Sequence, residues 1–381
     1  MTSARSRLFQ PLTIRGLTLR NRVVISPMCQ YSAKDGMADA WHLVHLGQFA
    51  IAGAGLVFSE AAAVEARGRI THGDLGIWSD AHAAALKPVA AFISAQGAAP
   101  GIQIAHAGRK ASMQRPWHGN GPMNDADIAR GERPWQVVAA SSVPVAEGWL
   151  MPHELRLDEI AAIQQAFADA AKRADAAGFE VLELHGAHGY LTHTFLSPLS
   201  NRRNDAYGGE RAGRMRFALE TAQAVRAAWP ERKPLFFRIS SVDGIEGGWE
   251  IEDSLALAGE LKARGVDVID CSSGGIGGPA TAAGVPRGPG FQLPYAERLR
   301  RDAGVMTQAV GLILTPEQAE AALAAGQADL VAIAREALFD PHWVGRAALA
   351  LEEEETAWGL WPKQYGWWLE RRAKALPRRS A

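Results

Sequence analysis

Residues 158–185 read DEIAAIQQAFADAAKRADAAGFEVLELH, a helical pattern followed directly by a short apolar run. Ile160, Ile163 and Phe167 recur at the three- and four-residue spacing that places side chains on one stripe of a helix. Glu180–His185 has the length and composition of a buried strand. The stretch therefore predicts a helix that packs against a sheet and is followed by the next strand of that sheet.

The same unit recurs along the chain. Seven further β-type runs, each followed by a helical pattern, lie at Arg22–Met28, Gly55–Ala61, Gly101–His106, Leu235–Ser240, Val266–Ser272, Val305–Gly311 and Leu330–Arg335. Strands that alternate with helices predict parallel βαβ units, and eight such units favour a closed (β/α)8 TIM barrel over an open sheet. Because no Gly-, Ser- or Pro-rich linker divides the sequence, we expect residues 1–381 to form a single α/β domain.

The composition excludes several classes of protein. The 381 residues include 40 Lys and Arg and 41 Asp and Glu, so no broad basic surface is expected for nucleic acid or anionic lipid. No apolar stretch approaches the roughly 18 residues of a membrane-spanning helix, and the N-terminus MTSARSRLFQPL lacks the apolar segment of a signal peptide. Two cysteines cannot form a disulfide framework. We therefore expect a cytoplasmic protein with no nucleic-acid or membrane partner.

Three segments depart from the regular pattern. Residues 107–158 separate the third strand from the next helix, and a loop this long after a barrel strand is expected to form a lid over the mouth, the alternative being a solvated insertion. The glycine-rich run Gly274–Gly278 lacks the G-x-G-x-x-G spacing of a dinucleotide site and is expected to be a flexible loop over the same mouth. The tail 356–381 carries four Trp and one Tyr within Trp358–Trp368, an aromatic surface that should be covered.

Polar and reactive residues gather at the ends of the predicted strands. In a (β/α)8 barrel, catalytic groups stand at the carboxyl ends of the strands and in the loops that follow. These strand ends hold Ser26-Pro27-Met28-Cys29, Glu60-Ala61, Gln103 to His106, His185-Gly186-Ala187-His188, Arg238, Cys271-Ser272-Ser273-Gly274, Gly311 and Ala334-Arg335. The strand middles, in contrast, are interpreted as apolar. This asymmetry predicts an active-site face.

Two sets of these residues suggest specific ligands. Because side chains alternate along a strand, Gln103, His185 and Arg238 can all point into the barrel, where an amide, an imidazole and a guanidinium would bond the edge of a flat heterocycle. The loops at Gly311 and Ala334-Arg335 follow the last two strands, the usual position of a phosphate site in such barrels.

His185 and His188 lie three residues apart with Tyr190 close behind. The pair can ligate a metal, can polarise a substrate carbonyl with Tyr190 as proton donor, or can be structural. Carbonyl binding is favoured, because no H-E-x-x-H pattern or cysteine partner set supports a metal. Cys29, at the end of the first strand, is either a reactive or a packed thiol.

Four motifs resemble those of the old yellow enzyme family of NADH:flavin oxidoreductases. They are SPMCQY at Ser26–Tyr31, GIQIAHAGRK at Gly101–Lys110, ELHGAHGY at Glu183–Tyr190 and LSNRRNDAYGG at Leu199–Gly209. The likeness runs from about Leu8 to Glu370 and is greatest to the cysteine-containing subgroup, which includes Bacillus-type ene-reductases and xenobiotic reductases.

The resemblance implies a tightly but non-covalently bound FMN at the top of the barrel, reduced by NADPH or NADH. Its contacts would come from Ser26, Pro27, Met28, Cys29, Ala61, Gln103, Arg238, Gly311, Ala334 and Arg335. Cys29 would tune the redox potential near the flavin N5, Gln103 would bond the pyrimidine edge, and Arg238 would stabilise the reduced anionic flavin. Relatives often have Gly-Arg where this chain has Ala334-Arg335, a change that keeps the backbone N–H.

The resemblance also implies the reaction. The small-molecule substrate would be an α,β-unsaturated carbonyl compound, a quinone or a nitro compound. His185 and His188 would hold its oxygen and Tyr190 would protonate the α-carbon, while Tyr31 and Lys110 would contact the substrate or hold the lid. Trp368 of the tail would enter the neighbouring active site of a homodimer or higher homo-oligomer.

Overall fold

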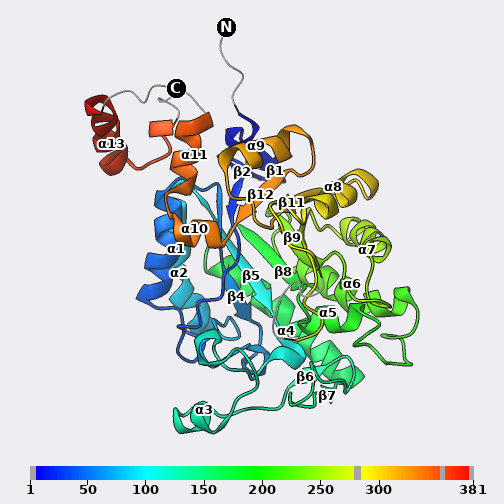
Figure 1. Ribbon diagram of the computed structural model, residues 1–381. Helices are drawn as coiled ribbons and strands as arrows, with labels where there is room; N and C mark the ends of the chain where they lie inside the picture. The colour runs from blue at the N-terminus through cyan, green and yellow to red at the C-terminus, as the bar shows by residue number, and fades with distance from the viewer. Residues whose placement is uncertain (1–5, 279–284, 352–356, 377–381) are drawn as a thin grey trace.

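A barrel of parallel strands forms the centre of the computed structural model, which describes residues 6–278, 285–351 and 357–376 (Figure 1). Eight strands close in the order β3-β4-β5-β8-β9-β10-β11-β12. Their bounds are β3 Val23–Ile25, β4 Leu56–Ala63, β5 Ala99–Ala105, β8 Val181–Gly186, β9 Leu235–Ser240, β10 Val268–Ser272, β11 Met306–Ala309 and β12 Leu330–Ile333. Each predicted β-type run contains or overlaps one strand, so the (β/α)8 prediction is confirmed.

Helices surround the barrel. They are α1 Ala40–Ile51, α2 Asp80–Ala95, α4 Leu157–Ala176, α5 Leu191–Leu196, α6 Arg211–Ala228, α7 Ile251–Ala263, α8 Leu293–Asp302, α9 Pro316–Ala324, α10 Arg335–Phe339 and α11 Trp343–Leu351. The stripe predicted from the opening stretch is the buried face of α4, where Ile160, Ile163 and Phe167 are fully buried. None of the described helices combines the length and the apolar character needed to cross a membrane.

Two cores follow from the alternation of side chains along each strand. Outward-facing residues pack against the helices, and inward-facing residues such as Val181, Phe236 and Val268 fill the lower barrel. A hairpin of β1 Leu12–Ile14 and β2 Leu17–Leu19 closes the amino-terminal end of the barrel, because its Ile14 and Leu19 belong to the inner cluster. Phe58 on β4 meets Phe236 edge to face, with ring centroids 5.8 Å apart.

The long segment after β5 folds over one side of the molecule (Figure 1). It contains helix α3 Asp125–Ala129 and a two-stranded sheet of β6 Val138–Ala139 and β7 His153–Glu154. Its buried residues Ala107, Ala111, Met113 and Val137 form a third small core, against which Cys29, Tyr31 and Tyr190 pack. The predicted insertion therefore packs on the residues expected at the mouth; its motion as a lid stays a prediction.

The aromatic tail divides into a covered and an exposed part. Trp361 is 7% exposed and lies so close to α11 that a Cβ on Gly345 would come within 2.0 Å of its ring. Trp367 and Trp368, on helix α13 Lys363–Ala375, are 47% and 66% exposed. Residues 356 and 377–381 of the predicted tail lie outside the described residues.

Candidate active site

A cavity of about 330 Å³ opens at the carboxyl ends of the barrel strands. Residues predicted to hold the cofactor line it: Ser26, Pro27, Arg238, Gly311, Ala334 and Arg335. His188, Ser272, Ser273, Arg287, Phe291, Gln292 and Val310 complete the lining. Gly311 has φ +120°, and a Cβ there would come within 3.0 Å of the Phe291 ring. The backbone conformation and the nearby Phe291 ring therefore require a glycine at position 311, in the lining of the cavity.

The other residues predicted to contact the cofactor are Met28, Cys29, Ala61 and Gln103. They follow β3 or belong to β4 and β5, the strands that come next in the barrel. Ala61 on β4 lies opposite Gln103 on β5, and the two are 5% and 2% exposed. Met28 is partly buried and packs its side chain against the outer core. Burial, followed by the charge of Glu60, raises the pKa of the half-buried Cys29, which keeps it a thiol at neutral pH.

Gln103, His185 and Arg238 point inward, as their strand positions predict. Gln103 Nε2 donates to Glu183 Oε1 at 2.7 Å. Arg238 Nη1 donates to Ser26 Oγ at 3.1 Å, and its Nε lies 3.4 Å from Asp270 Oδ2. The guanidinium thus reaches from the barrel interior to the wall of the cavity.

The predicted apolar character of the strand middles is wrong at three positions. Glu183, Asp270 and Gln308 lie in the middle or at the end of β8, β10 and β11, and all are fully buried inside the barrel. The signal that reveals them is parity, because Glu183 lies opposite Gln103, Asp270 lies opposite Arg238, and Gln308 lies opposite Asp270 on the neighbouring strand.

The two histidines and Tyr190 form one cluster. The ring of His185 lies 5.2 Å from that of His188 and 4.8 Å from that of Tyr190, centroid to centroid. Nδ1 of His185 accepts a bond from the Ala187 N–H at 3.1 Å, so Nε2 carries the proton of the neutral ring and is free to donate. Nε2 of His188 lies 2.6 Å from Ser272 Oγ, and its backbone has φ +60°.

The surroundings set the protonation of this cluster. Burial, together with the charge of Arg238, lowers the pKa of both His185 and His188 well below the ordinary value. Burial also raises the pKa of Tyr190 well above its ordinary value. At neutral pH the site therefore holds two uncharged imidazoles beside a protonated phenol. Tyr31, with φ +53°, packs with this cluster in the third core.

Lys110 is not among the residues that line the cavity. It is 3% exposed, and its Nζ donates to the carbonyls of His188, at 2.9 Å, and Gly275. Burial lowers the pKa of Lys110 to about 7. Arg109 Nη2 donates to the Ile276 carbonyl at 2.7 Å. Lys110 and Arg109 thus bond two carbonyls within Gly274–Gly278, and the expected flexibility of that loop stays a prediction.

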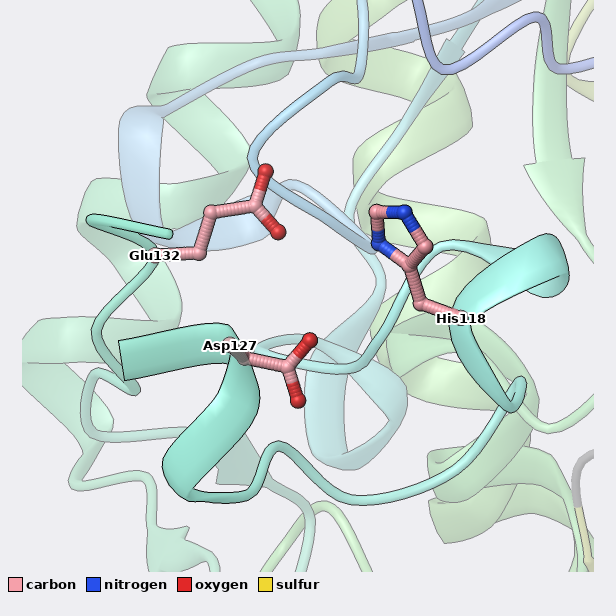
Figure 2. Close-up of side chains that lie close together, drawn as sticks. All are labelled: His118, Asp127 and Glu132. Carbon is pink, nitrogen blue, oxygen red and sulfur yellow. The ribbon is translucent and has the colours of Figure 1, made fainter. Parts of the chain in front are cut away.

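The metal alternative for the histidine loop finds no third ligand in the described structure. His193 Nε2 lies 2.8 Å from Asp243 Oδ1, and both side chains are fully buried away from the cavity. Among the described residues, the side chains of His118, Asp127 and Glu132, in the segment 107–158, bring potential metal-ligand atoms within 4.8 Å of one another (Figure 2). The two carboxylates bond Arg130 and Arg115.

These guanidinium partners give the lid cluster a structural explanation. Asp127 Oδ2 accepts from Gln114 Nε2 at 2.7 Å and from the Asn124 N–H at 2.8 Å, which closes the capping box of α3. The cluster is an ion-pair network that fixes α3 to the segment before it. The Asp127–Arg130 pair and the Asn124–Asp127 capping box follow from three-residue spacings in the sequence, whereas the Arg115–Glu132 pair, 17 residues apart, depends on the fold of the segment.

Known proteins match the chain over nearly its whole length. Residues 7–354 match the family model described as "NADH:flavin oxidoreductase / NADH oxidase family". The NADPH dehydrogenase of Geobacillus sp. (strain WCH70) is 44% identical over 90% of this chain and 94% of that protein. The NADPH dehydrogenase of Bacillus subtilis (strain 168) is 41% identical over 95% of this chain and 99% of that protein.

Solved structures support the same assignment. Morphinone reductase in complex with tetrahydroNAD superposes with a TM-score of 0.73 at 28% identity, covering 92% of this chain and 93% of that one. The chain therefore belongs to the old yellow enzyme family of NADH:flavin oxidoreductases and is an FMN-dependent NAD(P)H oxidoreductase.

Proposed function

We propose that this protein is an ene-reductase, which passes a hydride from NADPH or NADH through FMN to the β-carbon of an α,β-unsaturated carbonyl compound. Quinones, nitro compounds and related xenobiotics are alternative acceptors of the same electrons. The observation that carries the proposal is the cluster of His185, His188 and Tyr190, in which uncharged N–H donors and a protonated phenol stand together at the mouth.

The residues at the mouth fit FMN. Two arginines, Arg287 and Arg335, and the close-approach glycine Gly311 line one end of the cavity and suit a phosphate. Gln103 and Arg238 at the barrel axis suit the edge of the ring system. When bound there, the flavin supplies a two-electron carrier that both the nicotinamide and the acceptor can use.

The protein's own groups then polarise and protonate the acceptor. The Nε2 proton of His185 is available to a carbonyl oxygen, and a hydrogen bond there draws electron density from the conjugated alkene. His188 would join it by exchanging its bond to Ser272 for one to the substrate. The hydroxyl of Tyr190 gives its proton to the α-carbon, and Tyr31 forms part of the adjoining wall.

Replacing both histidines tests this assignment. We expect His185→Ala/His188→Ala to keep the yellow flavin and its reduction by NADPH, while turnover of 2-cyclohexenone falls at least 100-fold, the typical loss when a preorganised donor is removed. His153→Ala, at a half-exposed histidine paired with Glu159, is the matched control. Unchanged enone turnover in the double variant would refute the role of the pair.

We further propose a homodimer or higher homo-oligomer in which Trp368 enters the neighbouring active site. Helix α13 lies beside α11, away from α3, β6 and β7 (Figure 1). Trp368 is 66% exposed at a groove of about 620 Å³ that also involves Trp358, Trp361 and Tyr365. A cytoplasmic location, where nicotinamide cofactors are available, belongs to the same proposal.

The dimer is tested by light scattering and by Trp368→Ala, with Trp367→Ala as its neighbour control. A second copy that supplies Trp368 predicts a raised KM for the acceptor without loss of flavin. A monomer, or an unchanged KM in both variants, contradicts the proposal.

A further inference from the structure

A layer of five polar side chains crosses the barrel below the cavity. They are Gln103, Glu183, Arg238, Asp270 and Gln308, from β5, β8, β9, β10 and β11, and none is more than 8% exposed. In the strand register Gln103 lies opposite Glu183, and Asp270 lies opposite both Arg238 and Gln308. The layer rests on the apolar floor that includes Val181, Phe236 and Val268.

The layer contains two carboxyl groups but one guanidinium. Asp270 Oδ2 lies 3.4 Å from Arg238 Nε, whereas Glu183 Oε1 is paired with the neutral amide of Gln103. Glu183 Oε2 and both oxygens of Asp270 are buried and, taken as ionised carboxylates, accept no well-aligned hydrogen bond among the described residues. The two acids lie within hydrogen-bonding reach of each other, and Gln308 lies within reach of Asp270. Two ionised carboxylates in this setting would leave one negative charge buried and unpaired, at a cost of several kcal/mol.

One retained proton removes this imbalance. Burial raises the pKa of Glu183 and of Asp270, and the charge of Asp270 raises that of Glu183 further. Asp270 is the acid that pairs with the guanidinium, at 3.4 Å from Arg238 Nε, whereas Arg238 acts on Glu183 only through its charge. The geometry therefore places the proton on Glu183, and its Oε2, which accepts no bond, is the atom available to carry it.

We propose that Glu183 and Asp270 are positioning residues that set the redox potential of the flavin through Gln103 and Arg238. Asp270 offsets part of the charge that Arg238 presents at the cavity, where its Nη1 bonds Ser26. Glu183, as a neutral acid, fixes the amide of Gln103 by accepting from its Nε2. The inference rests on the proposed placement of FMN above these two side chains.

Replacing each acid with its near-isosteric amide should affect the midpoint potential of the flavin differently. Asp270→Asn removes a negative charge beside Arg238, so the anionic reduced flavin is stabilised and the midpoint potential rises. Glu183→Gln replaces a neutral group with a neutral group and leaves the potential nearly unchanged. For Asp270→Asn we expect a shift of at least tenfold in the reduction equilibrium, which is about 30 mV for a two-electron couple.

The potentials are measured on the yellow holoenzymes by redox titration, with FMN dissociation constants determined alongside. The control is Glu260→Gln, which changes the net charge by the same amount as Asp270→Asn. It removes a surface carboxylate that is 51% exposed and paired with Arg264. Equal rises in Asp270→Asn and Glu183→Gln would show that both acids are ionised and overturn the proposal. So would an unshifted potential in Asp270→Asn with FMN fully bound.

A measurement on Glu183 keeps the proposal testable if Asp270→Asn does not fold. At pH 9, where Asp74 with its pKa of about 7 is ionised, the wild-type holoenzyme should show the infrared C=O stretch of a protonated carboxylic acid, and Glu183→Gln should lack it. A wild-type spectrum without that band refutes the retained proton on Glu183. Failure of the proposed function looks different, because the wild-type protein would then bind FMN with the expected potentials but leave enones unreduced.

Discussion

Lys110 offers a quantitative test of the site's electrostatics. Its ammonium is 3% exposed and donates to two backbone carbonyls, and burial, followed by the charge of Arg109, lowers its pKa from 10.5 to about 7. The unfolded chain then binds one more proton than the folded chain at any pH between about 7 and 10.5 at this residue. Stability rises with pH wherever the unfolded state holds more protons, by about 1.4 kcal/mol per pH unit for one proton.

The perturbation is Lys110→Met, which keeps the length of the side chain and removes its titration. Between pH 7 and pH 9 we expect wild type to gain about 2.3 kcal/mol of unfolding free energy relative to the variant, because folded Lys110 is half protonated at pH 7 and neutral at pH 9. His185 and His188, whose pKa the charge of Lys110 also lowers, are already uncharged over this range. Below about pH 6 the difference is flat. Lost hydrogen bonds to the carbonyls of His188 and Gly275 add a pH-independent offset of about 1–3 kcal/mol each.

The assay is urea unfolding followed by circular dichroism at several pH values. Lys172→Met, at a lysine that is 59% exposed and paired with Asp169, is the control and should show no pH-dependent difference from wild type. A constant difference between wild type and Lys110→Met from pH 7 to 9 would refute the lowered pKa.

Two further predictions concern the mouth. Tyr190→Phe should lower the enone-dependent rate at least 100-fold, the usual contribution of a positioned acid, while NADPH still reduces the flavin at the wild-type rate in stopped-flow experiments; equal loss in both half-reactions would exclude a role confined to the acceptor. Gly311→Ala should weaken FMN binding at least tenfold by equilibrium dialysis, because φ +120° and the Phe291 ring at 3.0 Å leave no room for a Cβ; unchanged affinity would remove Gly311 from the proposed phosphate end.

Much of the barrel and part of the site are predictable from sequence, because both follow from the two-residue period of strands. That period placed Gln103, His185 and Arg238 inside the barrel, where the structure has them. The same period puts Glu183 on the face of His185 and Asp270 on the inward face of its strand, but the partners of the two acids are known only once the strands are paired.

Other parts of the site depend on tertiary contacts that have no local pattern. The hydrogen bond from Lys110 to Gly275 joins residues 165 positions apart, and the one from Arg109 to Ile276 joins residues 167 positions apart. The composition of the glycine-rich loop Gly274–Gly278 indicates flexibility. Only the folded chain shows that the carbonyls of Gly275 and Ile276 accept hydrogen bonds from Lys110 and Arg109. The division of the tail into a buried Trp361 and an exposed Trp368 depends in the same way on the small residue Gly345 in α11.

The hairpin of β1 and β2 has a consequence for the kinetics. Its Ile14 and Leu19 fill the amino-terminal end of the barrel, so small molecules approach the reacting centre from the opposite end. On the proposed function, we expect the hydride donor and the acceptor to share one entrance, so that the first product leaves before the second substrate enters. Double-reciprocal plots at several fixed acceptor concentrations should therefore be parallel, and excess donor should inhibit turnover by occupying the place of the acceptor.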